Sequence, residues 1–215
     1  MVVAIDGPSG VGKSTVSRRV AKELGARYID TGAMYRAVAL GLSDEGIKVD
    51  NVKGLDVFLN AMEFSFEGEL VLLNDVDMTQ KIREAEAGEL ASKYASLTKV
   101  RRRLVEMQRD YAKSGSVVME GRDITTVVLP KADFKFFLTA SPEVRAKRRL
   151  ADEKSTDNRN IEEVAGDINA RDERDSTRKD SPLKKAEDAI EIDTGLLSID
   201  GVVEKIMGQI KERGL

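Results

Sequence analysis

The hydrophobic positions at the start of the chain follow two periods in succession. Val2–Ile5 is an apolar run ended by Asp6–Pro8, which is typical of a buried parallel strand that enters a turn. Residues 14–24 then carry apolar side chains at intervals of four, and Gly25 fits the end of a helix. The pattern predicts a strand, a glycine-rich turn and a helix, which together open an α/β sheet.

Three later apolar runs, at residues 116–119, 134–138 and 189–192, predict further buried strands of the same sheet. Between the first strand and these runs the pattern changes to alternation. Glu63–Leu73 has Phe64 and Phe66 before a turn at 67–69, and Leu70 and Leu72 after it. This alternation predicts an antiparallel hairpin inserted into the parallel core.

Two other segments differ from the strands in composition. Residues 84–113 are rich in Ala, Glu, Arg and Leu, which predicts helix. Residues 151–178 contain many charges and few large apolar side chains, which predicts a mobile, solvated arm.

Composition narrows the chemistry that this chain can perform. The 215 residues are 41% hydrophobic, which suits one globular domain with an insertion or two small domains. A net charge of −3 argues against non-specific binding of nucleic-acid polymers. With no Cys and no His, disulfides, thiolate catalysis and the commonest general base are excluded. We expect a cytoplasmic protein, because no apolar run is long enough to span a bilayer and no signal-like pattern opens the chain.

The strongest motif lies in the turn after the first strand. Residues 7–14 match G-x-x-x-x-G-K-[ST], whose backbone N–H groups bind phosphate oxygens. Lys13 would bring a positive charge to the β- and γ-phosphates, and Ser14 would offer its hydroxyl to Mg²⁺. The predicted nucleotide-binding residues are Gly7, Pro8, Ser9, Gly10, Val11, Gly12, Lys13, Ser14 and Thr15.

A phosphate loop leaves several function classes open. A regulatory GTPase would normally carry D-x-x-G and N-K-x-D segments, and neither string occurs in this chain. A transport or AAA-type ATPase would show an apolar strand that ends in Asp or Asp-Glu. Residues 117–120 resemble that pattern, but Gly121-Arg122-Asp123 follows them.

The arginines of this chain favour a kinase that transfers a phosphoryl group to an anionic acceptor. This reaction depends on positioning the two phosphates and neutralising their charge more than on acid–base groups. Arg145, Arg148 and Arg149 lie on one predicted helix after Pro142. A second set is spaced to share one helical face: Arg171, Arg174 and Arg178.

The segment at residues 28–36 adds a candidate acceptor site. Arg36 is suited to a bidentate pair with a phosphate, and Tyr35 to stacking or hydrogen bonding. It directly follows the first strand and helix, where small-molecule kinases place their acceptor.

Together these strings resemble the cytidylate kinase family of bacterial nucleoside monophosphate kinases. The resemblance covers nearly the whole chain and rests on residues 7–15, 30–36, 82–83, Ser92, 100–101, 121–123 and 171–178. It implies a three-layer P-loop kinase fold with a central parallel sheet, an inserted domain with a small antiparallel sheet, and a helical lid. By this resemblance the core domain would be 1–38 and 97–215, the lid about 146–160, and the nucleoside-monophosphate-binding insertion 39–96.

The resemblance also implies residue roles. The acceptor phosphate would be held by Tyr35, Arg36 and Arg122, and cytosine would be contacted by Ser92, Arg101 and Asp123. The ribose would be contacted by Arg171, Asp175 and Arg178, and Thr31 would also bind the substrate. The residues that act in catalysis would be Lys13, Arg122 and Arg148. Glu120 departs from the family, which usually has Asp there, and Thr125 stands where Gly is common.

The cytosine assignment has a physical basis as well. Cytosine offers an amine donor at N4 and acceptors at N3 and O2, so a carboxylate and an arginine complement it. We therefore expect transfer of the γ-phosphoryl group from ATP to CMP or dCMP with Mg²⁺, directly and in line, by a monomer without a nucleic-acid or membrane partner. A kinase for shikimate or dephospho-coenzyme A, and a nucleotide-dependent binding switch, are the alternatives.

Overall fold

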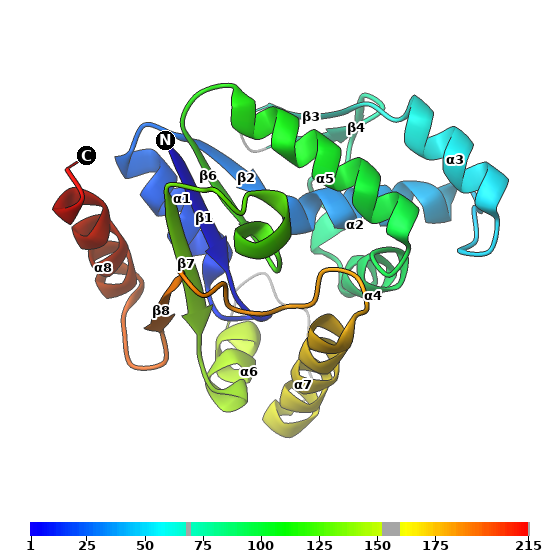
Figure 1. Ribbon diagram of the computed structural model, residues 1–215. Helices are drawn as coiled ribbons and strands as arrows, with labels where there is room; N and C mark the ends of the chain where they lie inside the picture. The colour runs from blue at the N-terminus through cyan, green and yellow to red at the C-terminus, as the bar shows by residue number, and fades with distance from the viewer. Residues whose placement is uncertain (68–69, 152–159, 215) are drawn as a thin grey trace. The chain divides into compact units, whose positions relative to one another are not determined.

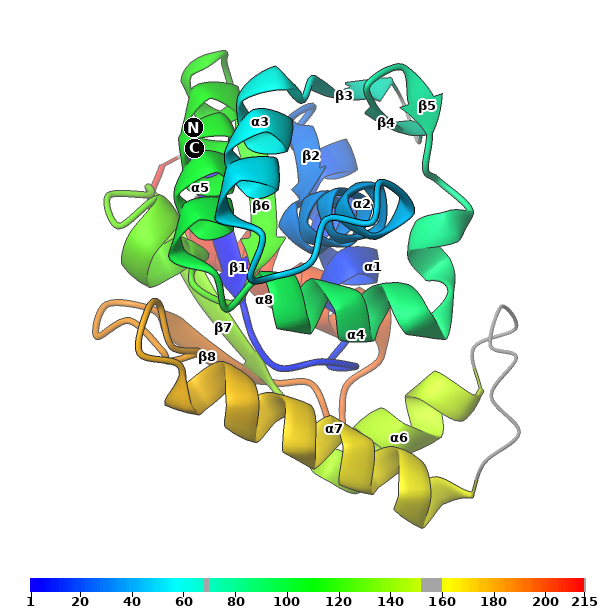
Figure 2. The same cartoon turned by 90° about the vertical axis from the view of Figure 1, so that its right-hand side faces the viewer.

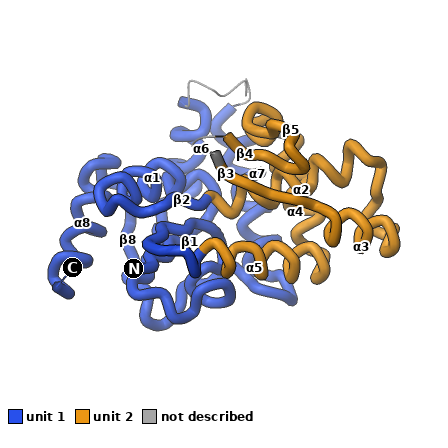
Figure 3. The backbone as a smooth tube through the Cα atoms, turned by 90° about the horizontal axis from the view of Figure 1, so that it is seen from above, with its two compact units in different colours: residues 1–29, 112–215 blue, residues 30–111 orange. Residues whose placement is uncertain are grey.

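A computed structural model describes residues 1–67, 70–151 and 160–214, and the chain divides into two compact units. Unit 1 comprises residues 1–29 and 112–215, and unit 2 comprises residues 30–111 (Figure 3). The sequence placed the insertion at 39–96, whereas unit 2 also holds the helices that flank this range. The units divide near helix ends, between residues 29 and 30 and between residues 111 and 112.

Unit 1 is built on a five-stranded sheet in the order β2-β6-β1-β7-β8. Its strands are β1 (Val2–Asp6), β2 (Arg27–Asp30), β6 (Val117–Gly121), β7 (Phe134–Thr139) and β8 (Ile190–Asp193). β1 pairs in parallel with β6 and with β7, and β7 pairs in parallel with β8. The four apolar runs are thus confirmed as strands, while β2 was not predicted because its sequence, RYID, has only one apolar aliphatic residue.

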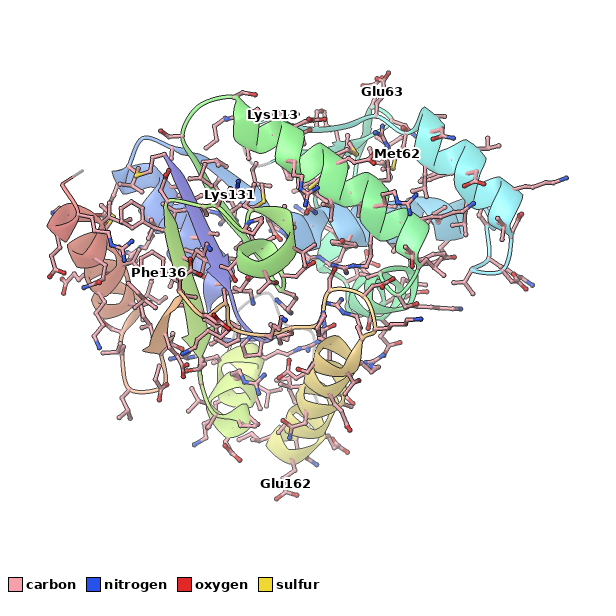
Figure 4. The ribbon with its side chains drawn as sticks, in the orientation of Figure 1. Met62, Glu63, Lys113, Lys131, Phe136 and Glu162 are labelled. Atoms are coloured by element: carbon pink, nitrogen blue, oxygen red, sulfur yellow. The ribbon has the colours of Figure 1, made fainter. Side chains whose placement is uncertain are left out.

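Helices complete the unit around this sheet. They are α1 (Lys13–Glu23), α6 (Pro142–Leu150), α7 (Ile161–Thr177) and α8 (Ile199–Glu212), with a π-helical turn, η2 (Ile124–Val128), after β6. Phe136 of β7 is fully buried among apolar side chains from the sheet, α1 and α8 (Figures 1 and 4). Apolar burial on this scale supplies most of the driving force for folding.

The prediction of a mobile, solvated arm at residues 151–178 is wrong for residues 161–177. Residues 161–177 form α7, which packs against α6 through Ala146, Val164 and Ile168 (Figure 2). Three or four apolar positions at helical spacing are enough to bury one face, even where the average composition is highly charged. Residues 152–159, which include part of the predicted lid, lie outside the described residues.

Unit 2 combines helices with a small antiparallel sheet. Its elements are α2 (Thr31–Asp44), α3 (Val52–Ala61), β3 (Phe64–Glu67), β4 (Leu70–Leu73), β5 (Val76–Asp77), the 3₁₀ turn η1 (Lys81–Arg83), α4 (Ala85–Tyr94) and α5 (Thr98–Lys113). The predicted helical region 84–113 is therefore two helices. Within the described chain, no helix is long and apolar enough to cross a membrane.

The predicted hairpin is confirmed as β3 and β4, and β5 adds a third strand. Phe64 pairs with Leu73, and Phe66 with Val71. Val71 and Leu73 are therefore the buried positions of β4, whereas Leu70 is 42% exposed. The buried positions of β4 are thus Val71 and Leu73 rather than the alternating Leu70 and Leu72 that indicated the hairpin, because antiparallel pairing puts opposed residues on the same face.

The apolar contact between α6 and α7 predicts a measurable effect on stability. Ile168→Ala should lower the free energy of unfolding by about 2–4 kcal/mol, because it leaves a cavity in a small cluster. Ile161→Ala, on the same helix but 41% exposed, should cost less than about 1 kcal/mol. Chemical denaturation of both variants checks this, and equal losses would contradict the packing described for α7.

Candidate active site

The loop between β1 and α1 has a backbone that only glycine adopts readily. Gly7, Gly10 and Gly12 have φ values of 153°, 75° and 95°. A Cβ at Gly7 would also lie 2.3 Å from the carbonyl oxygen of Leu138. These conformations suit a loop whose N–H groups converge on an anion at the N-terminus of α1. The loop therefore has the form that phosphate binding requires.

Lys13 begins α1 and is buried, with its Nζ donating to the carbonyl oxygen of Pro8 at 2.7 Å. Burial lowers the pKa of its ammonium from 10.5 to about 7; the positive charges of Arg122 and Arg171 act in the same direction, whereas Glu120 and Asp6 raise it. A negatively charged ligand next to Lys13 would restore its charged form.

Arg145 and Asp172 hold the loop from α6 and α7. Arg145 is buried, and its guanidinium donates to the carbonyl oxygens of Ser9 (3.0 Å) and Ala140 (3.1 Å) and to the carboxylate of Asp172. The other oxygen of Asp172 accepts the N–H of Ser9 at 3.3 Å. Both main-chain polar groups of Ser9 are thus bound by one ion pair. Asp172 was not singled out from the sequence, because nothing local marks its link to a residue 163 positions away.

Arg148, predicted to be catalytic, contacts both the side chain and the main chain of Thr194 in the structure. Its Nη1 donates to the Thr194 hydroxyl (2.9 Å), and its Nη2 to the Thr194 carbonyl oxygen (2.5 Å). The Thr194 hydroxyl in turn donates to the carbonyl oxygen of Val11 at 3.2 Å. Arg148 therefore links α6 to the loop after β8 and to the phosphate loop.

Asp175 organises two of the predicted substrate-binding arginines. Its Oδ2 accepts from Nε of Arg122 at 3.2 Å, and its Oδ1 lies 3.6 Å from Nη1 of Arg178. Arg178 ends α7 in an extended conformation and donates to the carbonyl oxygen of Ser181, while Arg171 is half-buried on the helix. Arg174, which was expected to share a helical face with Arg171 and Arg178, is exposed on α7.

The end of β6 carries buried carboxylates. Asp123 follows the strand and is 4% exposed. Glu120, also buried, accepts a hydrogen bond from the Tyr28 hydroxyl at 2.9 Å, so the longer side chain finds a partner where the family usually has Asp. Asp6, at the end of β1, is buried with them and was interpreted in the sequence only as the end of a strand.

In unit 2, Asp30 sets up the first turn of α2. It is the N-cap: its Oδ1 accepts the N–H of Ala33 at 2.8 Å, and its Oδ2 pairs with Nη2 of Arg36 at 3.2 Å. A Cβ at Gly32 would lie 3.0 Å from Nη1 of Arg36, so the glycine leaves space for the guanidinium. Thr31 is buried in the same turn.

The other predicted residues of unit 2 come from α2, α4 and α5. The guanidinium of Arg101, which is 5% exposed, lies 5.5 Å from the ring centroid of Tyr35, within the range of a cation–π contact. Ser92 is half-buried on α4, which packs against α2. The structure thus brings Tyr35 to Arg101 in this unit, and Arg122 to Asp175 and Arg178 in unit 1.

The low pKa of Lys13 predicts proton uptake when ATP binds. In the free protein the ammonium is mostly deprotonated at pH 8 and protonated at pH 6. Because phosphate oxygens favour the charged form, Lys13 should take up close to one proton on binding at pH 8 and almost none at pH 6. Calorimetry in buffers of different ionisation enthalpy measures this. Lys13→Arg, which stays charged, should show no uptake at pH 8; equal uptake in both proteins would contradict the assignment to Lys13.

Comparison with known proteins identifies the family of this chain. Residues 3–212 match the cytidylate kinase family. The chain is 46% identical over 220 residues to a cytidylate kinase of Clostridium tetani, covering 100% of this chain and 97% of that protein. A cytidylate kinase of Fusobacterium nucleatum is 44% identical, covering 99% and 98%.

Solved structures support the fold alone. A gluconokinase from Sinorhizobium meliloti has a TM-score of 0.55 at 13% identity, covering 99% of this chain and 92% of that one. A shikimate kinase from Bacteroides thetaiotaomicron has a TM-score of 0.50 at 14% identity, covering 98% of each. The chain thus has the fold of P-loop kinases and belongs to the cytidylate kinase family, nucleoside monophosphate kinases that use ATP as phosphate donor.

Proposed function

We propose that this kinase phosphorylates CMP or dCMP, so that the products are ADP and CDP or dCDP. The observation that carries the proposal is the family match over residues 3–212, which includes both groups of predicted site residues. A monomeric state and a cytoplasmic location, both expected from the sequence, belong to the same proposal.

The phosphate loop is the proposed binding site for ATP. The N–H groups of residues 7–15, the N-terminus of α1 and the Lys13 ammonium would bind its phosphates. Ser14 is exposed in the first turn of α1, so its hydroxyl is accessible as an oxygen ligand of Mg²⁺. That donor fits Mg²⁺, which usually takes few protein ligands and fills the rest with phosphates and water. When bound, Mg²⁺ would neutralise phosphate charge.

Each unit contributes its own residues to the proposed CMP contacts. Arg36 and Tyr35 of unit 2 and Arg122 of unit 1 would hold the phosphate. Arg36 and Arg122 each have a carboxylate partner, Asp30 or Asp175, that orients the guanidinium and leaves other N–H donors for an anion. Preorganised arginines of this kind need little rearrangement to bind a phosphate.

The remaining contacts concern the base and the sugar. Asp123 would accept from the cytosine amine, and Arg101 would donate to N3 or O2, with Ser92 beside the base. Arg171, Asp175 and Arg178 would contact the ribose. Thr31 would also belong to the substrate-binding residues. Burial of Asp123 and Arg101 supports base selection, because mispaired buried polar groups are costly.

Chemistry of this kind does not require a general base. The CMP phosphate is already an anionic nucleophile that can attack the γ-phosphorus in line, and the chain has no histidine. The proposed work of Lys13 and Arg122 is to neutralise charge that shifts to the leaving oxygen. Arg148 would act with them, and its bonds to Thr194 hold it against the phosphate loop.

An acceptor panel tests the substrate class. ADP formation from ATP and Mg²⁺ should depend on CMP or dCMP and be weak with UMP, AMP, GMP and shikimate. Turnover that favours shikimate, or that shows no dependence on any acceptor, would contradict the proposal.

Base selection gives a sharper prediction for Asp123. In wild type, UMP places its O4 against the carboxylate and its N3–H against Arg101. CMP should therefore exceed UMP by on the order of 10² in kcat/KM. Asp123→Asn should shrink this ratio, chiefly by weakening CMP, because the amide can turn its NH₂ group toward O4 of uracil.

The measurement is kcat/KM for both acceptors in both proteins. Asp50→Asn removes the same charge from an exposed position and serves as the matched control. An unchanged ratio in Asp123→Asn, or an equal change in Asp50→Asn, would remove Asp123 from base selection.

A further inference from the structure

Asp6 connects the strand that leads into the phosphate loop with the turn that follows β6. The side chain is fully buried. Its Oδ1 accepts the N–H of Ile124 at 3.0 Å, and its Oδ2 accepts both the N–H and the hydroxyl of Thr125 at 2.7 Å each. All three donors come from the two residues directly after Asp123.

These hydrogen bonds are what makes the burial of Asp6 tolerable. A buried carboxylate without donors would be strongly destabilising. Burial raises the pKa of Asp6, the bonds from Thr125 and Ile124 lower it, and the negative charge of Asp123 raises it again. The last effect indicates that the carboxylates of Asp6 and Asp123 are near enough to repel each other. The three donors hold Asp6 in place despite that repulsion.

The Thr125 hydroxyl is the specific part of this arrangement. Almost any residue at 124 and 125 would supply the two backbone N–H groups, but only Ser or Thr supplies the third donor. Thr125 is 1% exposed, so water does not replace that donor easily. A buried group that loses its hydrogen-bond partner is destabilised, so the loss of this bond should be measurable.

The bonds to Asp6 also restrict the backbone on one side of Asp123. The peptide N–H that follows Asp123 is bound by Oδ1 of Asp6. The carbonyl oxygen of Asp123 accepts the N–H groups of Val127 at 2.8 Å and Val128 at 3.1 Å. With its following peptide held at both polar atoms, Asp123 has little freedom to change its ψ angle, and the direction of its side chain is set accordingly.

We propose that Asp6 and Thr125 are positioning residues for base selection: they orient Asp123 so that its carboxylate accepts from the cytosine amine. This inference rests on the proposed function and goes beyond it, because neither residue touches the substrate in that proposal. Asp6 also directly precedes Gly7, so the same carboxylate anchors the start of the phosphate loop to the base-selecting turn.

The test removes only the hydroxyl. Thr125→Val keeps the shape and the backbone N–H, and Thr125→Ala is a second variant in case valine does not fold. Both should lower the CMP-to-UMP ratio of kcat/KM by about fivefold to tenfold, chiefly through CMP, and leave the KM for ATP within about twofold. Thr125→Ser, which retains the hydroxyl, should restore the ratio.

Thr79→Val is the matched control. Thr79 is also buried, and its hydroxyl oxygen accepts the N–H of Val71 at 3.0 Å, but it lies in unit 2, in the turn after β5. Its replacement should lower the melting temperature and leave the ratio of CMP to UMP unchanged.

The outcomes separate the two proposals. If wild type does not prefer CMP, the proposed function is wrong whatever the Thr125 variants do. If wild type prefers CMP and the Val and Ala variants keep the full ratio, the positioning role is wrong while the proposed function stands. Equal losses with CMP, UMP and ATP, or a ratio that falls as far in Thr79→Val, would also overturn the positioning role, because they indicate general destabilisation.

Discussion

The buried ammonium of Lys13 is the group around which the other charges at the phosphate loop are arranged. Placing a cation in the first turn of α1, away from water, lowers its pKa to about 7 and requires negative charge nearby. Asp6 and Glu120 provide part of it, each bound to another partner: Asp6 to the turn after β6, and Glu120 to Tyr28. The carboxylates therefore support Lys13 without closing an ion pair on it, which leaves the ammonium able to bind phosphate.

Carboxylates also orient the arginines of the candidate site. Arg122, Arg145 and Arg36 are each oriented by an aspartate, namely Asp175, Asp172 and Asp30. An arginine has five N–H donors, so one carboxylate orients the guanidinium and still leaves donors for an anion. For Arg145, main-chain oxygens take further donors, and this arginine holds the phosphate loop. The kinase thus obtains preorganised positive charge from ion pairs, in a chain that has no histidine.

Much of this could be predicted from the sequence wherever the signal is local. The glycines of residues 7–12, the lysine that follows them and the apolar runs of four strands appear in the hydrophobic and glycine pattern itself, because backbone sterics and burial act over a few residues. The elements that the sequence did not predict correctly have weak or masked local patterns. β2 is too short and polar to show a period, and in α7 two buried residues, Val164 and Ile168, were hidden by the charged composition around them.

What only the tertiary structure decided is which charges meet. The bonds from Ile124 to Asp6 and from Ser9 to Asp172 join residues 118 and 163 positions apart, and no spacing rule connects such pairs. The sequence by itself determined the phosphate loop, the main strands and the set of arginines, since these depend on residue type and short-range period. The partners of Arg122 and Arg145, the contacts of Asp6 and the link through Arg148 to Thr194 depend on parallel strands ending at one edge of the sheet, and that is set by the packing of the whole unit.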